Sequence, residues 1–200
     1  MKKVILSFAV LAMVTSCKKE EKKVEKTEEI IEQPITQETP NDAVSLVEMD
    51  LKGTKLQVSH GSLEQNVVEF LNSGSYEKAT EDELKEKWYD LRDVNFEMGS
   101  ATALTQGSQK QLDNLVAILK AYPTAKIKIG GYTDKTGNED SNKKISQARA
   151  EFIKAELEKA GVGAQVVSAE GYGSEFAKVA ADASDEERAT DRKMSIRFTK

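Results

Sequence analysis

Apolar and polar residues recur in regular patterns over the second half of this 200-residue chain. Between residues 106 and 121, apolar side chains follow the i, i+3, i+4, i+7 spacing of one helix face, and Pro123 marks where that helix ends. A longer helix is predicted over 142–160, where Gly161 stops the pattern. The apolar residues of the first helix are Leu112, Leu115, Val116 and Leu119.

Strands are predicted around these helices by period-2 alternation. In one strand Ile127 and Ile129 alternate with lysines, so one face of this strand is predicted to be exposed to solvent. The strand ends at Gly130-Gly131, where a close approach of another backbone is expected. The other strands are predicted near 91–96, over 166–172 and over 194–198, and a short helix capped by Ser184 over 184–192. The order predicts an α+β fold, a βαβα(β) sandwich with helices on one face of a small mixed sheet.

Residues 43–89 are predicted to form a small accessory segment packed on this 90–200 domain. The pattern predicts a hairpin with its turn at 52–54, followed by a helix. Ser62 is the predicted N-cap of this helix, and the segment 73–75 is predicted to end it. Another short helix is predicted over 81–87. The sequence assigns no function to this segment.

The first 16 residues have the pattern of a secretory signal peptide: a cationic start, a short apolar run and small residues before Cys17. The apolar run over 4–14 is too short for a bilayer, which needs roughly 20 residues. Val14-Thr15-Ser16-Cys17 resembles the lipobox of bacterial lipoproteins, whose Cys becomes the acylated N-terminus. The alternative is a plain cleaved signal followed by an incidental Cys.

Residues 17–42 are rich in Lys and Glu and contain Pro34 and Pro40, which predicts a flexible charged tether behind the lipidated N-terminus. Its span is about 25–30 Å as a coil and roughly 80 Å fully extended.

Composition excludes several classes of function. The formal net charge of -5 argues against a nucleic-acid partner, which needs a basic face. The chain has one His, His60, and one Cys, so neither a Cys/His metal cluster nor an internal disulfide can form. Carboxylate-only metal sites have no spacing signature, and we predict no metal and no cofactor.

The helix predicted over 142–160 carries a cation within its apolar face. On a helical wheel of about 100° per residue, Arg149 falls between Phe152 and Ile153. A cation on a buried face must be paired or must face a ligand. Because Glu156 also projects onto this face, the pattern alone leaves both a structural and a ligand-binding Arg149 open.

The segment 129–150 resembles the OmpA-like C-terminal domain, whose motif reads GHTD, TG and NxxLSxxRA. Segments 171–173 and 187–193 are similar to the family's GYG and GRAxNRR elements. The similarity covers about half of the chain, 91–200, and with the lipobox the whole resembles the peptidoglycan-associated lipoprotein type. The residues that carry it are Ile129-Gly130-Gly131-Tyr132-Thr133-Asp134, Thr136-Gly137, Asn142, Ile145-Ser146 and Arg149-Ala150.

The sequence departs from the family motif at four positions. Tyr132 stands in place of the usual His, Ile145 in place of Leu, and Lys193 in place of the second Arg. Asp191 replaces Asn, and its carboxylate could pair with Arg192 and weaken that residue's contact with a ligand.

The resemblance implies binding of meso-diaminopimelate in the peptide stem of peptidoglycan, whose side chain ends in an ammonium and a carboxylate. It assigns Asp134 to the ammonium and Arg149 to the carboxylate, with a favourable field from the helix N-terminus. Thr136, Asn142 and Arg192 match further positions that line the site.

The leading hypothesis is a non-catalytic lipoprotein, anchored in the cell outer membrane through acylated Cys17, whose periplasmic C-terminal domain binds peptidoglycan. One alternative is an interaction hub that recruits Tol-type periplasmic proteins, as relatives do. Another is a cell-wall hydrolase, but His60 lies outside the matched domain and no nucleophile–His–acid set is apparent, so no catalytic residue is predicted.

Overall fold

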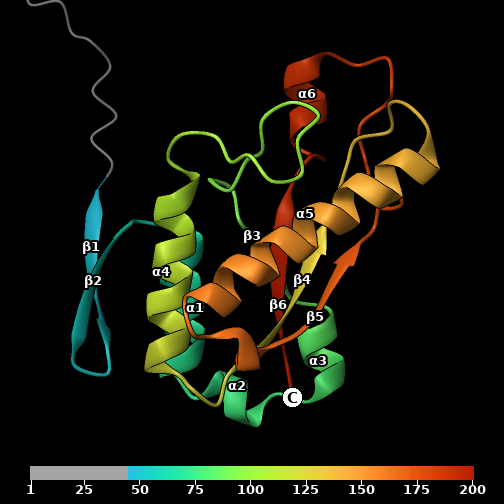
Figure 1. Ribbon diagram of the computed structural model, residues 1–200. Helices are drawn as coiled ribbons and strands as arrows, with labels where there is room; N and C mark the ends of the chain where they lie inside the picture. Colours follow the sequence, from blue (N-terminus) through green and yellow to red (C-terminus); the bar gives the residue numbers. More distant parts are fainter. Residues whose placement is uncertain (1–44) are drawn as a thin grey trace, which may run out of the picture. The chain divides into compact units, whose positions relative to one another are not determined.

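The structure is a computed structural model that describes residues 45–200 (Figure 1). The predicted signal peptide, Cys17 and the predicted tether lie outside these residues. In chain order the elements are β1 (Leu46–Leu51), β2 (Thr54–Ser59), α1 (Leu63–Asn72), α2 (Ser75–Lys78), α3 (Glu81–Lys85), β3 (Trp88–Asp90), α4 (Ser108–Ala121), β4 (Lys126–Gly131), α5 (Glu139–Lys159), the 3-10 helix η1 (Gly163–Gln165), β5 (Val166–Gly171), α6 (Asp185–Ala189) and β6 (Met194–Thr199).

A four-stranded mixed sheet, in the order β3-β6-β4-β5, forms the centre of the domain. β4 and β5 run parallel, whereas β6 is antiparallel to both β3 and β4. α4 and α5 lie on the same side of this sheet, and α5 crosses β4 and β5 (Figure 1). The predicted α+β class, with helices over one face of a small mixed sheet, is confirmed.

Alternate residues of the strands supply the core beneath the helices. Ile127 and Ile129 of β4 lie opposite Phe198 and Ile196 of β6, and all four side chains are buried. Full burial of each such side chain stabilises the fold by roughly 1.5–3 kcal/mol. The helices contribute Val67, Val68, Leu71, Leu115, Ile118, Leu119, Ile153 and Leu157 to the same core.

The segment before residue 90 is part of this core and of this sheet. The predicted hairpin and the Ser62 cap are confirmed: β1 pairs with β2, and the Ser62 hydroxyl accepts a hydrogen bond from the Gln65 amide. The edge strand β3, however, lies at 88–90 and not near 91–96. The alternation over 94–98 belongs to a loop, in which Phe96 bridges to Leu104 and Met98 is exposed.

Helix α5 begins three residues earlier than predicted. The Asn138 side chain accepts a hydrogen bond from the Ser141 amide and so caps the helix before Glu139. Two acidic residues, Glu139 and Asp140, occupy the first turn, where the helix dipole favours negative charge.

Two strand-end glycines let the backbone of α5 approach the sheet. A Cβ atom on Gly131 would collide with the Ser146 carbonyl, and one on Gly171 would collide with the backbone of Gln147. The predicted close approach at the end of β4 is therefore confirmed.

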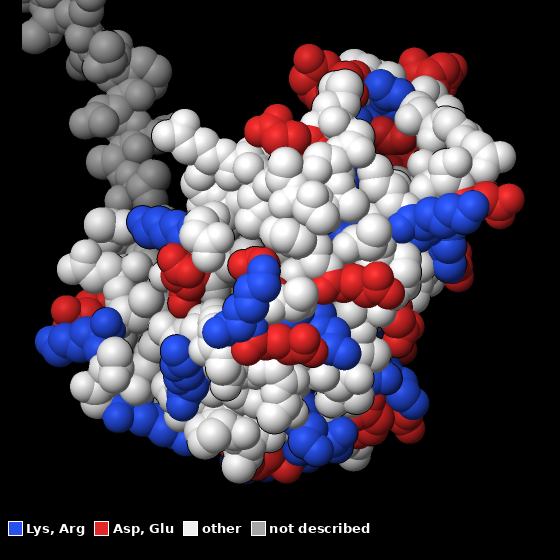
Figure 2. Space-filling view, in the orientation of Figure 1, with Lys and Arg blue, Asp and Glu red and all other residues white. Residues whose placement is uncertain are grey.

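The face that α4 and α5 form is polar outside. Figure 2 shows cationic and acidic side chains interspersed over it. Within residues 45–200, no helix combines the length and the apolar character that a membrane span requires.

A single buried amide closes the C-terminal end of α4. Gln165, from η1, donates from its side-chain nitrogen to the carbonyls of Leu119, Tyr122 and Ala125 at 2.9–3.1 Å. The carbonyls of Leu119 and Tyr122 also accept backbone amides, from Tyr122 and Ala125, so the Gln165 side chain supplies a second hydrogen bond to each of them.

We therefore expect Gln165→Leu to lower the free energy of unfolding by about 1–3 kcal/mol, because it removes the hydrogen bonds of the buried Gln165 amide to three carbonyls. Gln109→Leu is the matched control, because the exposed Gln109 bonds only Asp113 on its own helix and should cost less than about 0.5 kcal/mol. Urea unfolding of both variants measures the difference, and equal losses would contradict this role of Gln165.

A candidate carboxylate-binding cleft beside Asp134

A cleft of about 490 Å³ opens where the loop after β3, the loop after β4, helix α5 and helix α6 meet. Four of the five site residues predicted in this domain, Asp134, Thr136, Arg149 and Arg192, line it. The other lining residues are Val94, Asn95, Phe96, Met98, Gly99, Asp185, Arg188, Ala189, Lys193 and Met194.

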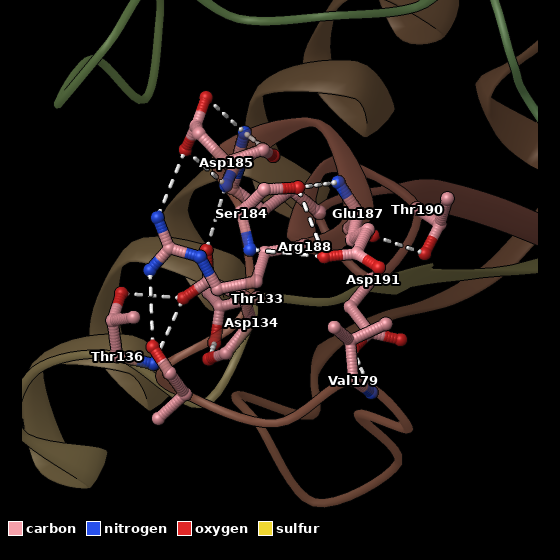
Figure 3. Close-up of polar contacts among 12 residues, drawn as sticks. Thr133, Asp134, Thr136, Val179, Ser184, Asp185, Glu187, Arg188, Thr190 and Asp191 are labelled. Atoms are coloured by element: carbon pink, nitrogen blue, oxygen red, sulfur yellow. Dashed lines mark hydrogen bonds and ion pairs between the residues drawn. The ribbon is translucent and has the colours of Figure 1, made fainter.

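Asp134 follows β4 and is the buried anion of the cleft. One carboxylate oxygen accepts hydrogen bonds from the Thr136 amide (2.9 Å) and hydroxyl (2.5 Å), and the other accepts one from Arg192 at 2.8 Å (Figure 3). Burial alone would raise the pKa of Asp134, but these hydrogen bonds outweigh it and hold the pKa below its ordinary value. Asp134 is therefore ionised at neutral pH.

Arg192 bridges two carboxylates. Its guanidinium lies 2.8 Å from Asp134 and 3.0 Å from Asp185, the first residue of α6. Burial opposes the charge, but the two carboxylates outweigh it and raise the pKa of Arg192. Sequence reasoning missed Asp185. The Ser184 cap put it in the first helical turn, but no sequence pattern related that turn to Asp134.

Arg149 projects from the middle of α5 into the cleft and has few partners. Its Nε donates to the Ser100 carbonyl at 2.9 Å, and its guanidinium lies 5.1 Å from the centre of the Phe96 ring. Its two terminal nitrogens make no hydrogen bond or ion pair to any of residues 45–200. Burial, assisted by the charge of Arg192, lowers the pKa of Arg149. This cation is thus partly desolvated without a compensating anion.

The loop that meets Arg149 is fixed to the start of α4. The buried Ser108 hydroxyl accepts a hydrogen bond from the Asn95 amide, and the Gln111 side chain accepts one from the Asp93 amide. The ring of Phe96 packs edge-on against Phe152 of α5. These contacts hold Phe96 and Ser100 against the guanidinium.

Asn142 does not line the cleft. Its side-chain amide donates to the Thr136 carbonyl at 2.9 Å and lies 3.5 Å from the Asp134 carbonyl, so it holds the loop that carries both residues. None of the α5 first-turn residues lines the cleft either. The expected contribution of the helix N-terminus to ligand binding is therefore not supported.

Asp191 points away from Arg192. Its carboxylate accepts hydrogen bonds from the amides of Lys178 and Val179 at 2.8–3.0 Å (Figure 3). The predicted competition of Asp191 for Arg192 is wrong, because the buried Asp191 is committed to this backbone turn.

The charges of the cleft favour an anionic group in the ligand. Four cationic side chains and two acidic ones line it. The Nε of Arg188 is buried without a hydrogen-bond partner among the described residues. Planar guanidinium groups match carboxylates best, through two parallel hydrogen bonds. No cluster of three or more potential metal ligands occurs within residues 45–200.

Fold and cleft together define a small α+β domain with a charged cleft at the ends of its parallel strands. The OmpA family model matches residues 95–192, and the chain belongs to the OmpA family through this domain.

Three relatives illustrate the similarity. Probable lipoprotein YiaD of Escherichia coli is 33% identical over 103 residues, which cover 52% of this chain and 46% of YiaD. Peptidoglycan-binding protein ArfA of Mycobacterium bovis is 36% identical over 85 residues, 42% of this chain and 26% of ArfA. The crystal structure of the peptidoglycan-associated lipoprotein from Burkholderia pseudomallei is 30% identical, with coverage of 53% and 88% and a TM-score of 0.47. The chain thus spans less than half the length of the two curated relatives.

Arg149→Met tests whether Arg149 is a structural residue. Because the Arg149 guanidinium is partly desolvated and has one hydrogen-bond partner, we expect the free energy of unfolding either to rise or to fall by less than about 1 kcal/mol. The matched control is Arg197→Met, because buried Arg197 donates charged hydrogen bonds to Glu81 and to the Phe198 carbonyl, whose loss should cost about 1.5–3 kcal/mol. Chemical unfolding gives both values, and comparable losses would identify Arg149 as structural.

Proposed function

We propose that this protein is a non-catalytic outer-membrane lipoprotein whose C-terminal domain binds the diaminopimelate stem of peptidoglycan. One observation carries the proposal: the partly desolvated guanidinium of Arg149 has terminal nitrogens without a protein partner, in the cleft that also holds the ionised Asp134.

The ligand chemistry fits this pair of groups. Diaminopimelate ends in a carbon that bears an ammonium and a carboxylate, so a receptor needs one anion and one cation side by side. The terminal nitrogens of Arg149 supply a fork for the carboxylate. Phe96, beneath the guanidinium, fixes the orientation of that fork.

Asp134 retains capacity for the ammonium. An ionised carboxylate has about four acceptor positions, and Thr136 and Arg192 together occupy three of them. Asp185 shares the positive charge of Arg192, so the Asp134 carboxylate is not fully neutralised within the protein. Thr136 and Arg192 would then orient the anion, and Asn142 would hold the loop beneath it.

Comparison supports the ligand class. ArfA, which aligns with this domain, is named a peptidoglycan-binding protein. The sequence supports the anchor, because Cys17 ends a lipobox-like segment, and YiaD is named a probable lipoprotein. The tether of residues 17–42 would then separate the lipid anchor from the cell wall. No observation favours a hydrolase, since His60 does not line the cleft.

Calorimetric titration with a diaminopimelate-containing stem peptide tests the cleft. Asp134→Asn and Arg149→Lys should each weaken binding on the order of tenfold to a hundredfold, because each removes charged hydrogen bonds worth roughly 1.5–3 kcal/mol. The double variant should lose less than the sum, because both residues hold one ligand group. Lys144→Met, at an exposed cation of the same helix, is the control and should bind normally.

A stem peptide with lysine in place of diaminopimelate sharpens this test, because lysine lacks the terminal carboxylate. The wild-type protein should bind the lysine peptide more weakly, whereas Arg149→Lys should hardly distinguish the two peptides. Wild-type affinity in a folded Asp134→Asn protein would rule the site out.

The anchor is tested by the intact mass of the protein extracted from membranes. We expect residues 1–16 to be missing and acyl chains to be attached to Cys17, since stable anchoring needs two or more chains. Cys17→Ser should abolish both changes. An unmodified full-length mass in the wild-type protein would refute the anchor.

A further inference from the structure

Four aromatic side chains gather on the face of the sheet opposite α5. The rings of Tyr132 and Tyr172 stack at 5.2 Å, and Trp88 and Phe176 each pack edge-on against both at 5.5–6.3 Å. We call these four residues the aromatic platform. Phe176 is 56% exposed, which is unusual for a phenylalanine.

The sheet dictates this placement. Trp88 of β3 lies opposite Arg197 of β6, on the strand face that points away from the core. Gly130 leaves the room that the rings need: a Cβ there would lie 2.9 Å from the Tyr132 hydroxyl and 3.0 Å from the Trp88 ring.

The platform is the wall of a second cleft, of about 660 Å³. Polar side chains surround the rings, and the Tyr132 hydroxyl makes no hydrogen bond to another described residue. The rim residues are Lys85, Glu86, Lys178, Thr190, Asp191, Lys193 and Ser195. A hollow with aromatic walls and a polar rim suits a ligand that inserts, not a flat protein surface.

Three of the five charged rim residues of the platform cleft are matched within the protein. Lys193 pairs with Asp90 at 2.9 Å, Lys85 pairs with Asp82 at 3.1 Å, and Asp191 accepts hydrogen bonds from backbone amides. The other two, Lys178 and Glu86, carry opposite charges and make no ion pair with a described residue. The Tyr172 hydroxyl donates to Glu170 at 3.0 Å. This differs from the Asp134 cleft, where guanidinium nitrogens lack partners. The platform therefore suits an uncharged ligand with apolar faces and many hydroxyl or amide groups.

We propose that the aromatic platform binds sugar rings of the glycan strand. A pyranose ring presents C–H faces that stack on aromatic rings, while its hydroxyl and acetamido groups can bond the Tyr132 hydroxyl and the rim. The choice of this particular polymer rests on the proposed function. The two clefts are neighbours, because Lys193 lines both of them and Tyr132 of one lies two residues before Asp134 of the other. One peptidoglycan unit, with its stem in the first cleft, would bring its sugars toward the second.

Trp88 is the only tryptophan of the chain, so its fluorescence reports on the platform. Titration of the full chain with the neutral β-1,4-linked tetrasaccharide of N-acetylglucosamine should change this fluorescence with saturation. Phe176→Ala should weaken tetrasaccharide binding about three- to tenfold, because it removes one exposed ring, and Phe176→Tyr should retain it. Leu46→Ala, at another exposed apolar residue, is the control and should bind normally.

Arg149→Lys separates this inference from the proposed function. It should weaken binding of the stem peptide and leave binding of the tetrasaccharide unchanged. Phe176→Ala should weaken binding of the tetrasaccharide and leave binding of the stem peptide unchanged. If the wild-type protein binds the stem peptide but not the tetrasaccharide, the platform proposal falls, the stem site stands, and a protein partner becomes the better occupant. If it binds the tetrasaccharide but not the stem peptide, the stem site fails and a sugar site remains. Tetrasaccharide binding that Phe176→Ala leaves unchanged would overturn the location.

Discussion

The contact between the backbone of α5 and the ends of β4 and β5 determines where every group of the site lies. Gly131 and Gly171 make this contact possible, because any side chain at either position would strike the helix. The Ser146 hydroxyl donates to the Lys143 carbonyl and accepts from the Gly173 amide, which joins helix and strand end at the same point. With α5 so close, Arg149, one turn further along, reaches the cleft below Asp134. A wider separation would remove Arg149 from this cleft.

Burial opposes the charged forms of both Asp134 and Arg149, but the protein compensates the two charges differently. Hydrogen bonds from Thr136 and Arg192 outweigh the burial of Asp134 and lower its pKa, which favours the ionised carboxylate. Arg149 has little such compensation, so its pKa is also lowered, which disfavours its charged form. Arg197 illustrates the contrasting case, since Glu81 meets its charge and Thr199 completes the network.

Period and spacing predicted most of the elements, because α4 and α5 each bury one regular face and β4 alternates over its first residues, although β6 is buried at all its positions. The same reasoning misplaced β3, since the alternation of Val94, Phe96 and Met98 arises in a loop whose members do not share a face. Within the candidate site, the resemblance named Asp134, Thr136, Arg149 and Arg192, and the fold brings these four together.

What the sequence could not supply are contacts between segments far apart in the chain. Asp185 reaches Arg192 only because α6 folds over the cleft. Asn142 matches the motif, but its amide is used to hold a loop. The aromatic platform was equally invisible, because Trp88 of β3, Tyr132 directly after β4 and Tyr172 directly after β5 come together only in the sheet order β3-β6-β4-β5. Tyr132, a departure from the family motif, packs against all three other rings, as Tyr172 does.

The segment from Tyr132 to Asp134 separates two surfaces with opposite electrostatic requirements. On one side, Asp134 and Arg149 present ionic groups whose hydrogen-bonding capacity the protein leaves partly unused. On the other, Lys193 and Lys85 are paired at 2.9–3.1 Å, and four aromatic rings form the wall of the cleft. Charge selects a ligand through direction and sign, whereas aromatic faces select through shape and tolerate many neutral partners. A domain that combines both surfaces along one segment can recognise a polymer whose side groups are charged and whose main chain is neutral.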